Sequence, residues 1–198
     1  VKIGGTIGCK YDCYKPEQSL PTDEAEQFHA WQVNQLADAG VDFLFGVTLP
    51  AVDEALGIAK AMAATNKAYF ISFVVNRKGE LLDATPLADA IEQIDTSTSR
   101  QPLGYMINCA YPTFLCAAQQ PESLFARLIG FQGNASSLDH SQLDCAEDLQ
   151  MDEVAHWGDE MLALHFKHGI KILGGCCGTN SEHLRYIIEN ADPQSTTN

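Results

Sequence analysis

The chain has 198 residues, of which 45% are hydrophobic, enough for a substantial core in one domain spanning residues 1–198. Its 26 acidic and 12 basic residues give a formal net charge of −14, which argues against phosphate backbones or anionic membranes as partners. No stretch approaches the ~20 uninterrupted apolar residues of a membrane helix, and no basic start precedes an apolar signal core. We therefore expect a cytoplasmic protein that binds neither nucleic acid nor membranes.

Short apolar runs rich in Val, Ile and Phe recur along the chain, and helical patterns lie between them. Runs of this kind are typical of strands buried on both faces of a parallel sheet. The six predicted strands begin at Val1, Val41, Ala68, Leu103, Ala126 and Ile170. The predicted helices span 23–39, 54–65, 86–94, 152–168 and 181–190.

The first predicted helix places Ala25, Phe28 and Leu36 on one apolar stripe, with Trp31 beside it. Gly40 follows where a left-handed C-terminal cap is needed.

Two further helices carry local signals. On 152–168, His165 falls on the apolar stripe, where we expect a buried histidine with satisfied hydrogen bonds. Before the last helix, Thr179 and Glu182 have the spacing of a capping box.

Strands that alternate with helices predict successive β/α units joined by right-handed crossovers. Two α/β architectures fit: an open doubly wound sheet, and a (β/α)₈ TIM barrel that is partial, with about six β/α units in this chain. No Gly-rich loop opens a helix after the first strand, which disfavours a dinucleotide-binding sheet. Cys109, Asn134, Cys176 and Cys177 all fall at C-terminal strand ends, where barrels gather their reactive groups, so we favour the barrel.

The seven cysteines are an odd number in an ordinary globular composition, so thiol chemistry or metal binding is favoured over disulfides. Cys176 and Cys177 follow Gly174 and Gly175, and adjacent cysteines rarely form a disulfide with each other because the geometry strains the peptide between them. A shared cation suits them better. With Cys109 as the third thiol, the pattern predicts a zinc site with an open fourth position.

Packing is the competing explanation for any single cysteine, because free cysteines are often buried. We expect packing or incidental positions for the remaining four, which are Cys9, Cys13, Cys116 and Cys145.

These residues resemble the homocysteine S-methyltransferase family. The zinc motif of that family ends in Gly-Gly-Cys-Cys, as at 174–177, and its third cysteine follows an asparagine, as at Asn108 and Cys109. The segment GVDFLFGVTLPAVDEA is similar to the family's Glu-Thr-x-Pro and Glu-Ala pattern, and GNAS from Gly133 is similar to its Pro-Asn-Ala-Gly. The likeness covers nearly the whole chain.

The resemblance implies a zinc-dependent barrel that transfers a methyl group from a sulfonium or ammonium donor to a thiol acceptor such as homocysteine, giving methionine. It implies Cys109, Cys176 and Cys177 as metal ligands, with zinc as the cofactor. It places Thr48, Asn108 and Asn134 at substrate-binding positions. The small-molecule partners are the thiol acceptor and the methyl donor.

Two departures from the family pattern bear on this prediction. Nothing in the chain matches the family's first two β/α units, so we expect an N-terminally incomplete barrel whose sheet edges favour a homo-oligomer. Val47 occupies the glutamate position of Glu-Thr-x-Pro and cannot pair with a substrate ammonium. The alternatives are a non-catalytic zinc-stabilised barrel or inactive family remnant, and a thiol-disulfide oxidoreductase, which lacks its usual Cys-x-x-Cys spacing.

Overall fold

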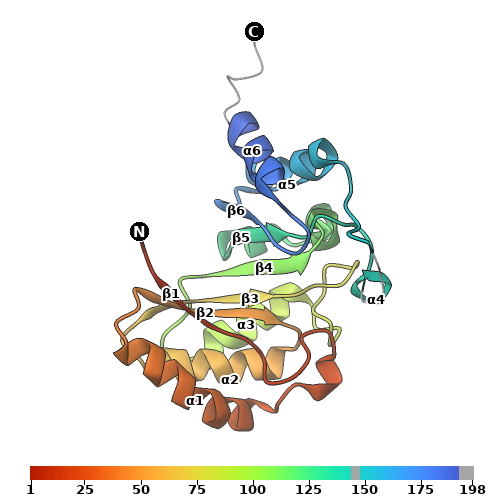
Figure 1. Ribbon diagram of the computed structural model, residues 1–198. Coiled ribbons are helices and arrows are strands. Elements are labelled where there is room, and N and C mark those ends of the chain that lie inside the picture. The colour runs from red at the N-terminus through yellow and green to blue at the C-terminus, as the bar shows by residue number, and fades with distance from the viewer. Residues whose placement is uncertain (144–147, 192–198) are drawn as a thin grey trace.

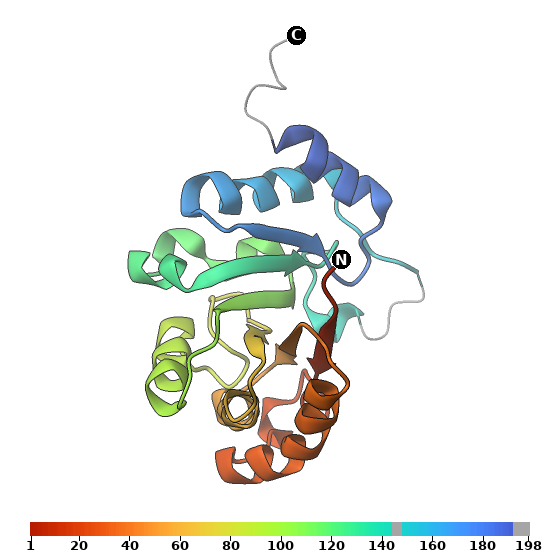
Figure 2. The same ribbon diagram turned by 90° about the vertical axis from the view of Figure 1, so that its left-hand side faces the viewer.

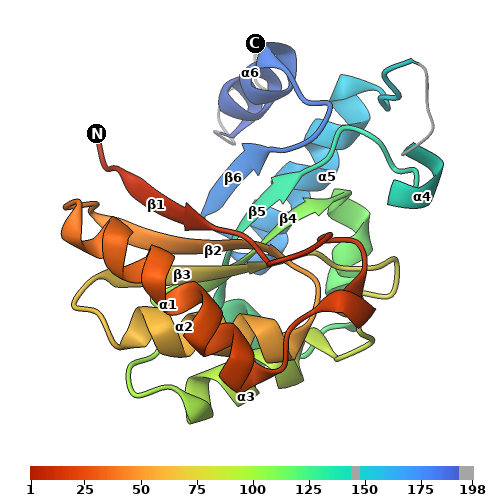
Figure 3. The same cartoon turned by 60° about the horizontal axis from the view of Figure 1, so that its bottom comes forward.

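The computed structural model describes residues 1–143 and 148–191, and within them six parallel strands form one sheet in chain order (Figure 1). The strands are β1 (Gly4–Ile7), β2 (Phe43–Leu49), β3 (Ala68–Phe73), β4 (Gly104–Ala110), β5 (Leu128–Gly133) and β6 (Ile172–Gly175). Each predicted strand is present, although β1 is shorter than the apolar run that contains it. The strands lie side by side from β1 to β6 (Figure 3).

Helices connect successive strands or follow the last one, and all but the short α4 cover the outer face of the curved sheet (Figure 2). They are α1 (Thr22–Asp38), α2 (Val52–Ala63), α3 (Leu87–Ser97), α4 (His140–Leu143), α5 (Val154–His168) and α6 (Ser181–Asn190). Short 3₁₀ turns span Pro16–Gln18, Pro112–Leu115, Ala117–Gln119 and Glu122–Ala126. The arrangement is a half-barrel, which confirms the predicted partial TIM barrel over the open doubly wound sheet. None of the helices in the described ranges combines the length and apolarity needed to cross a membrane.

The core lies between the outer face of the sheet and this helical layer. Tyr69, Phe73 and Tyr105 on the strands and Trp157 on α5 are fully buried in it. Because every crossover has to return over the same face, the side chains of the strands that point outward meet a helix, which explains why the apolar runs were readable in the sequence.

The face that α1 buries differs from the predicted stripe. Ala25, His29 and Val33 are the buried residues, whereas Phe28 is 50% and Trp31 is 74% exposed. The cause is the close packing of α1 on α2: a Cβ at Gly57 would lie 2.5 Å from the Cβ of Ala25. This contact turns the His29 side of α1 toward α2, and the aromatic side chains toward the surface.

The helix ends follow the predicted signals with one shift. Gly40 (φ +85°) and Gly169 (φ +72°) adopt the left-handed conformation after α1 and α5. The capping box of α6 lies one residue later than predicted, because the Asn180 side chain accepts from the backbone N–H groups of Glu182 and His183. His165 has the expected hydrogen-bond partner, with Nδ1 2.8 Å from the Ile170 carbonyl, but it is half-buried where a buried side chain was expected.

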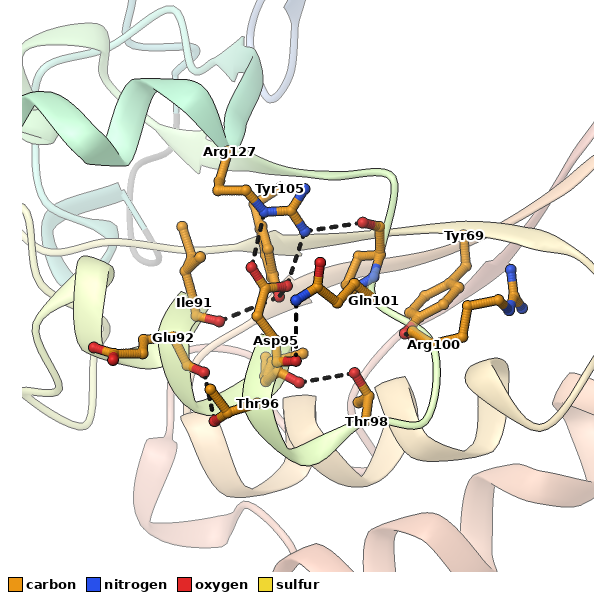
Figure 4. Close-up of polar contacts among 12 residues, drawn as sticks. Tyr69, Ile91, Glu92, Asp95, Thr96, Thr98, Arg100, Gln101, Tyr105 and Arg127 are labelled. Atoms are coloured by element: carbon orange, nitrogen blue, oxygen red, sulfur yellow. Dashed lines mark hydrogen bonds and ion pairs between the residues drawn. The ribbon is translucent and has the colours of Figure 1, made fainter.

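The N-terminal ends of the strands are tied by a polar network (Figure 4). Arg127, just before β5, donates from Nε and Nη2 to the two carboxylate oxygens of Asp95 on α3, both at 2.8 Å. The Tyr105 hydroxyl donates to Asp95 Oδ1, also at 2.8 Å. Arg100 Nη2 donates to the carbonyls of Thr65 (3.0 Å) and Lys67 (2.5 Å). The network of Asp95, Tyr105 and Arg127 links α3 to the starts of β4 and β5, and Arg100 separately holds the segment between α2 and β3.

Candidate metal and substrate site

Three cysteines converge at the opposite edge, where the strands end. Cys109 lies near the end of β4, and Cys176 and Cys177 follow β6. The Cys109 sulfur is 2.8 Å from that of Cys176 and 4.0 Å from that of Cys177, and all three lie within 4.8 Å of one another. No other group of three His, Cys, Asp or Glu side chains in the described part of the chain is arranged in this way. The predicted convergence of the sulfurs is therefore present.

Irregular backbone at the ends of β4 and β6 orients the cysteine side chains. The β4–β5 register shifts between Asn108 and Ala110, and Cys109 between them has a φ of +54°. A non-glycine residue with this φ is uncommon, and a bulge of this kind redirects a side chain at a strand end. At the last residue of β6, a Cβ on Gly175 would lie 2.1 Å from the Thr179 hydroxyl, so the turn that presents the vicinal cysteines requires glycine there.

Asn108 is the hub that supports Cys109. Its buried Oδ1 accepts from the Thr48 backbone N–H (2.9 Å) and the Ser72 hydroxyl (2.6 Å). Its Nδ2 donates to Thr48 Oγ1 (2.5 Å) and approaches the Cys109 sulfur at 3.3 Å. Thr48 is itself left-handed (φ +55°), at the irregularity between β2 and β3. The asparagine thus joins three strands behind the sulfur.

Asn134, just past β5, lies between Cys177 and a cavity. Its Oδ1 accepts from the Cys177 backbone N–H at 3.2 Å. The cavity, of about 450 Å³, is lined by Asn134 and Cys177 together with Asp12, Tyr14, Lys15, His140, Ser141 and Leu143. The rings of Tyr14 and His140 stack on one another, with centroids 4.5 Å apart and an interplanar angle of 6°. A small molecule in this cavity would lie beside the sulfur cluster.

The three thiols do not ionise independently. Hydrogen bonds from Cys109 and Cys176 lower the pKa of Cys177 to about 3. Hydrogen bonding to Cys176 and Cys177, followed by burial, raises the pKa of Cys109 well above the usual range for a thiol. The cluster by itself therefore favours a single thiolate, and a cation is needed to hold all three sulfurs deprotonated at neutral pH. The residues fit a metal ion that prefers thiolate ligands.

The remaining sequence predictions fall near or away from this cluster. Cys9 packs against the core and donates from its sulfur to the Tyr11 carbonyl (3.3 Å), and Cys116 donates to the Arg77 carbonyl (3.2 Å). Cys13 is half-buried on the same segment as Tyr14, and its pKa is raised by burial first and then by neighbouring charges that include Cys177. Cys145 lies outside the described residues. Val47 is half-buried on β2 and offers no polar atom.

Sequence reasoning missed Ser72, Asp12, Tyr14 and His140. Ser72 lies inside an apolar strand run, and its position on β3, the strand next to that of Cys109, depends on sheet order. The other three come from loops or short helices whose approach to one another leaves no periodic signal in the sequence.

Comparison with known proteins agrees with these motifs. The family model described as Homocysteine S-methyltransferase matches residues 1–191. The homocysteine S-methyltransferase YbgG of Bacillus subtilis is 27% identical over 192 residues, which cover 93% of this chain and 58% of that protein. The homocysteine S-methyltransferase of Escherichia coli is 27% identical over 176 residues, covering 84% and 53%. The chain therefore spans about half the length of the curated relatives it matches.

Solved structures show the same architecture. The homocysteine methyltransferase MmuM from Escherichia coli in its metallated form superposes with a TM-score of 0.69 at 22% identity, covering 94% of this chain and 60% of that one. Its apo form gives a TM-score of 0.67. The structural likeness supports the half-barrel fold, and the sequence match confirms the resemblance carried by the cysteine motifs. The chain belongs to the homocysteine S-methyltransferase family.

Proposed function

We propose that this chain carries the metal site of a zinc-dependent methyltransferase that moves a methyl group from a sulfonium or ammonium donor to a thiol acceptor such as homocysteine, giving methionine. The observation that carries the proposal is the convergence of Cys109, Cys176 and Cys177 beside a cavity large enough for small substrates.

One sulfur–sulfur distance in the cluster matches the spacing of zinc ligands, and the other is shorter. A tetrahedral zinc ion with bonds of about 2.3 Å separates its sulfur ligands by roughly 3.8 Å. The 4.0 Å between Cys109 and Cys177 is close to that value, whereas the 2.8 Å between Cys109 and Cys176 has to widen. Zinc, when bound, supplies the positive charge that keeps thiols deprotonated near neutral pH.

The chain's own residues position the reacting groups. Asn108 fixes Cys109 from behind, and Asn134 fixes the backbone of Cys177 through its Oδ1. Asn134 also lines the cavity, so its substrate contact is compatible with this role. The amide of Asn108 is already engaged with Thr48 and Ser72, so substrate contacts of Asn108 and Thr48 stay predictions. Holding the acceptor sulfur and the donor methyl group in line accounts for most of the catalysis in this proposal.

The substrate ammonium needs a carboxylate that Val47 does not provide. Asp12 and Lys15 line the cavity, with the Lys15 ammonium 3.7 Å from Asp12 Oδ2. An α-amino acid acceptor that entered the cavity could exchange this pair for its own ammonium and carboxylate groups. We therefore include Asp12 and Lys15 among the groups that orient an amino acid acceptor.

The decisive experiment combines metal analysis with a transfer assay. Purified protein is loaded with zinc and mixed with homocysteine and, in parallel, a methylsulfonium and a trimethylammonium donor, and methionine is measured. Methionine that forms only with zinc present supports the proposal. Stoichiometric zinc without methionine from either donor would favour the non-catalytic zinc-stabilised barrel.

A further inference from the structure

Residues 8–21, which link β1 to α1, form one side of the cavity beside Cys177, and we call this segment the wall loop. Asp12, Tyr14 and Lys15 contribute to the cavity from the wall loop. Its own hydrogen bonds are local, such as Lys15 N–H to the Asp12 carbonyl (3.0 Å) and Tyr14 N–H to Asp12 Oδ1 (2.9 Å). Local bonds shape a loop, but they do not fix its place against the rest of the fold.

Glu54 on α2 supplies that fixed point. Its carboxylate is completely buried and accepts three hydrogen bonds. Oε1 accepts from the Lys10 backbone N–H (2.7 Å) and from His29 Nε2 (3.0 Å), and Oε2 accepts from the Leu20 backbone N–H (3.2 Å). One carboxylate therefore holds both ends of the wall loop, as the closure of a compact loop requires.

The carboxylate is held in its charged form. Burial raises the pKa of Glu54, but the hydrogen bond from His29 and those from the Lys10 and Leu20 N–H groups outweigh it, so the pKa lies below the ordinary value. Hydrogen bonds to an ionised acceptor are roughly twice as strong as neutral ones.

Attachment of α1 to α2 does not depend on this carboxylate alone, although His29 on α1 bonds it. Gly57 already allows α2 to contact Ala25 and the Thr22 carbonyl on α1, and Asp53 Oδ1 accepts from the Thr22 hydroxyl at 3.2 Å. Two backbone N–H groups of the wall loop, by contrast, do depend on this carboxylate. Lys10 and Leu20 lie outside the strand and the helix, and for each of their N–H groups the carboxylate of Glu54 is the partner.

We propose that Glu54 is a positioning residue that holds the wall loop against the cavity, and so sets how tightly an acceptor is bound beside Cys177 without contacting either metal or substrate. The functional part of this inference rests on the proposed function above. The structural part, the clamp on the wall loop, does not.

The test uses Glu54→Gln in zinc-loaded protein. In either orientation the new amide NH₂ meets a backbone N–H that formerly donated, so one end of the wall loop is released. We expect the rate at which iodoacetamide alkylates Cys13, followed by peptide mass spectrometry, to rise on the order of tenfold. The rate at Cys116, whose thiol donates to the Arg77 carbonyl and not to the wall loop, should stay unchanged. Zinc content should also stay unchanged, while the Kd for homocysteine, measured by calorimetry, rises by a similar factor.

Matched variants distinguish loss of the Glu54 contacts to the wall loop from a general loosening of the fold. His29→Gln keeps an N–H donor for Glu54, so the Cys13 rate should stay within about twofold of the wild type. Glu54→Asp keeps both carboxylate oxygens at a shorter reach and should give an intermediate rise, which preserves the test if Glu54→Gln does not fold. Asp53→Asn, the neighbouring carboxylate, should leave Cys13 unchanged.

The outcomes are distinct. An unchanged Cys13 rate in Glu54→Gln, or equal increases at Cys13 and Cys116, would overturn the clamp. A selective rise at Cys13 in a protein whose wild type binds no homocysteine would support the clamp and count against the proposed function.

Discussion

The two edges of the sheet that are formed by the strand ends, one N-terminal and one C-terminal, use polar groups differently. At the N-terminal edge, Arg127, Asp95 and Tyr105 satisfy one another with hydrogen bonds of 2.8 Å, and none of the three has a positive φ. At the C-terminal edge, Thr48 and Cys109 have positive φ values, and three thiols meet that cannot all ionise without a cation. The contrast agrees with barrels generally, in which one end serves stability and the other chemistry.

The contrast separates contacts that stabilise the fold from backbone conformations that cost free energy. Bidentate pairing of arginine with a carboxylate stabilises the fold by itself. A left-handed threonine or cysteine instead costs on the order of 1–2 kcal/mol, and it persists only when the surrounding contacts hold it. At the C-terminal edge those contacts come from Asn108, so the arrangement of the thiols depends on packing that the rest of the half-barrel supplies.

The largest expected effect separates metal binding from stability. Cys176→Ala should weaken zinc binding by on the order of a hundredfold or more, since one of three thiolates is lost, and the metal-free variant should unfold close to the wild-type temperature. Metal analysis after dialysis and thermal unfolding of the metal-free proteins measure both. Cys116→Ala is the control and should retain zinc. Full zinc occupancy in Cys176→Ala would show that the cluster is not the metal site.

The second largest effect concerns the N-terminal edge, where a substitution should lower stability and leave zinc binding unchanged. Arg127→Met leaves the Asp95 carboxylate largely buried without its main partner, so the free energy of unfolding should fall by about 2 kcal/mol, with zinc content unchanged. Urea unfolding measures the loss. Lys2→Met, which removes the exposed Lys2–Asp42 ion pair, should leave the free energy of unfolding nearly unchanged, because solvent screens an exposed pair. Zinc loss in Arg127→Met would mean that the two edges are coupled.

Predictability from sequence also differs between the edges and their loops. The strands and the three cysteines were predictable because buried parallel strands are continuous apolar runs and because strand ends share one edge. The burial of His29 was not predictable, because Phe28 and Trp31 give α1 a more apolar stripe than the one that it buries. The positive φ of Thr48 and Cys109 and the approach of Tyr14 to His140 depend on contacts between distant segments, which no local pattern encodes.

The third prediction concerns the pH dependence of stability and the buried carboxylate of Glu54 on α2. Because its folded-state pKa is lowered, Glu54 contributes stability above its ordinary pKa of 4.5, and this contribution is lost as the pH falls below that value through the folded-state pKa. Urea unfolding of metal-free protein near neutral pH and below pH 4.5 should therefore show a steeper loss in the wild type than in Glu54→Gln. Parallel pH profiles would mean that the Glu54 carboxylate does not stabilise the folded state.

The smallest effect tests whether backbone strain belongs to the site. Ala84 (φ +67°) is exposed in a turn, and Thr48 (φ +55°) is held by Asn108. Glycine relieves the strain at either position but increases the entropy of the unfolded chain, so Ala84→Gly should raise the free energy of unfolding by only about 0.5 kcal/mol. Thr48→Gly gains the same relief and loses the hydroxyl that receives Asn108 Nδ2, so its stability should fall by about 1 kcal/mol.

Zinc affinity distinguishes the two glycine variants further. Release of Asn108 should let Cys109 move, and loss of such a supporting contact typically weakens metal binding by roughly tenfold or more. Competition with a chelator should show this weakening in Thr48→Gly and wild-type affinity in Ala84→Gly. Equal gains in stability and equal affinities in the two variants would mean that the left-handed backbone at Thr48 is an ordinary turn conformation, and that Asn108 does not hold the thiol edge in place.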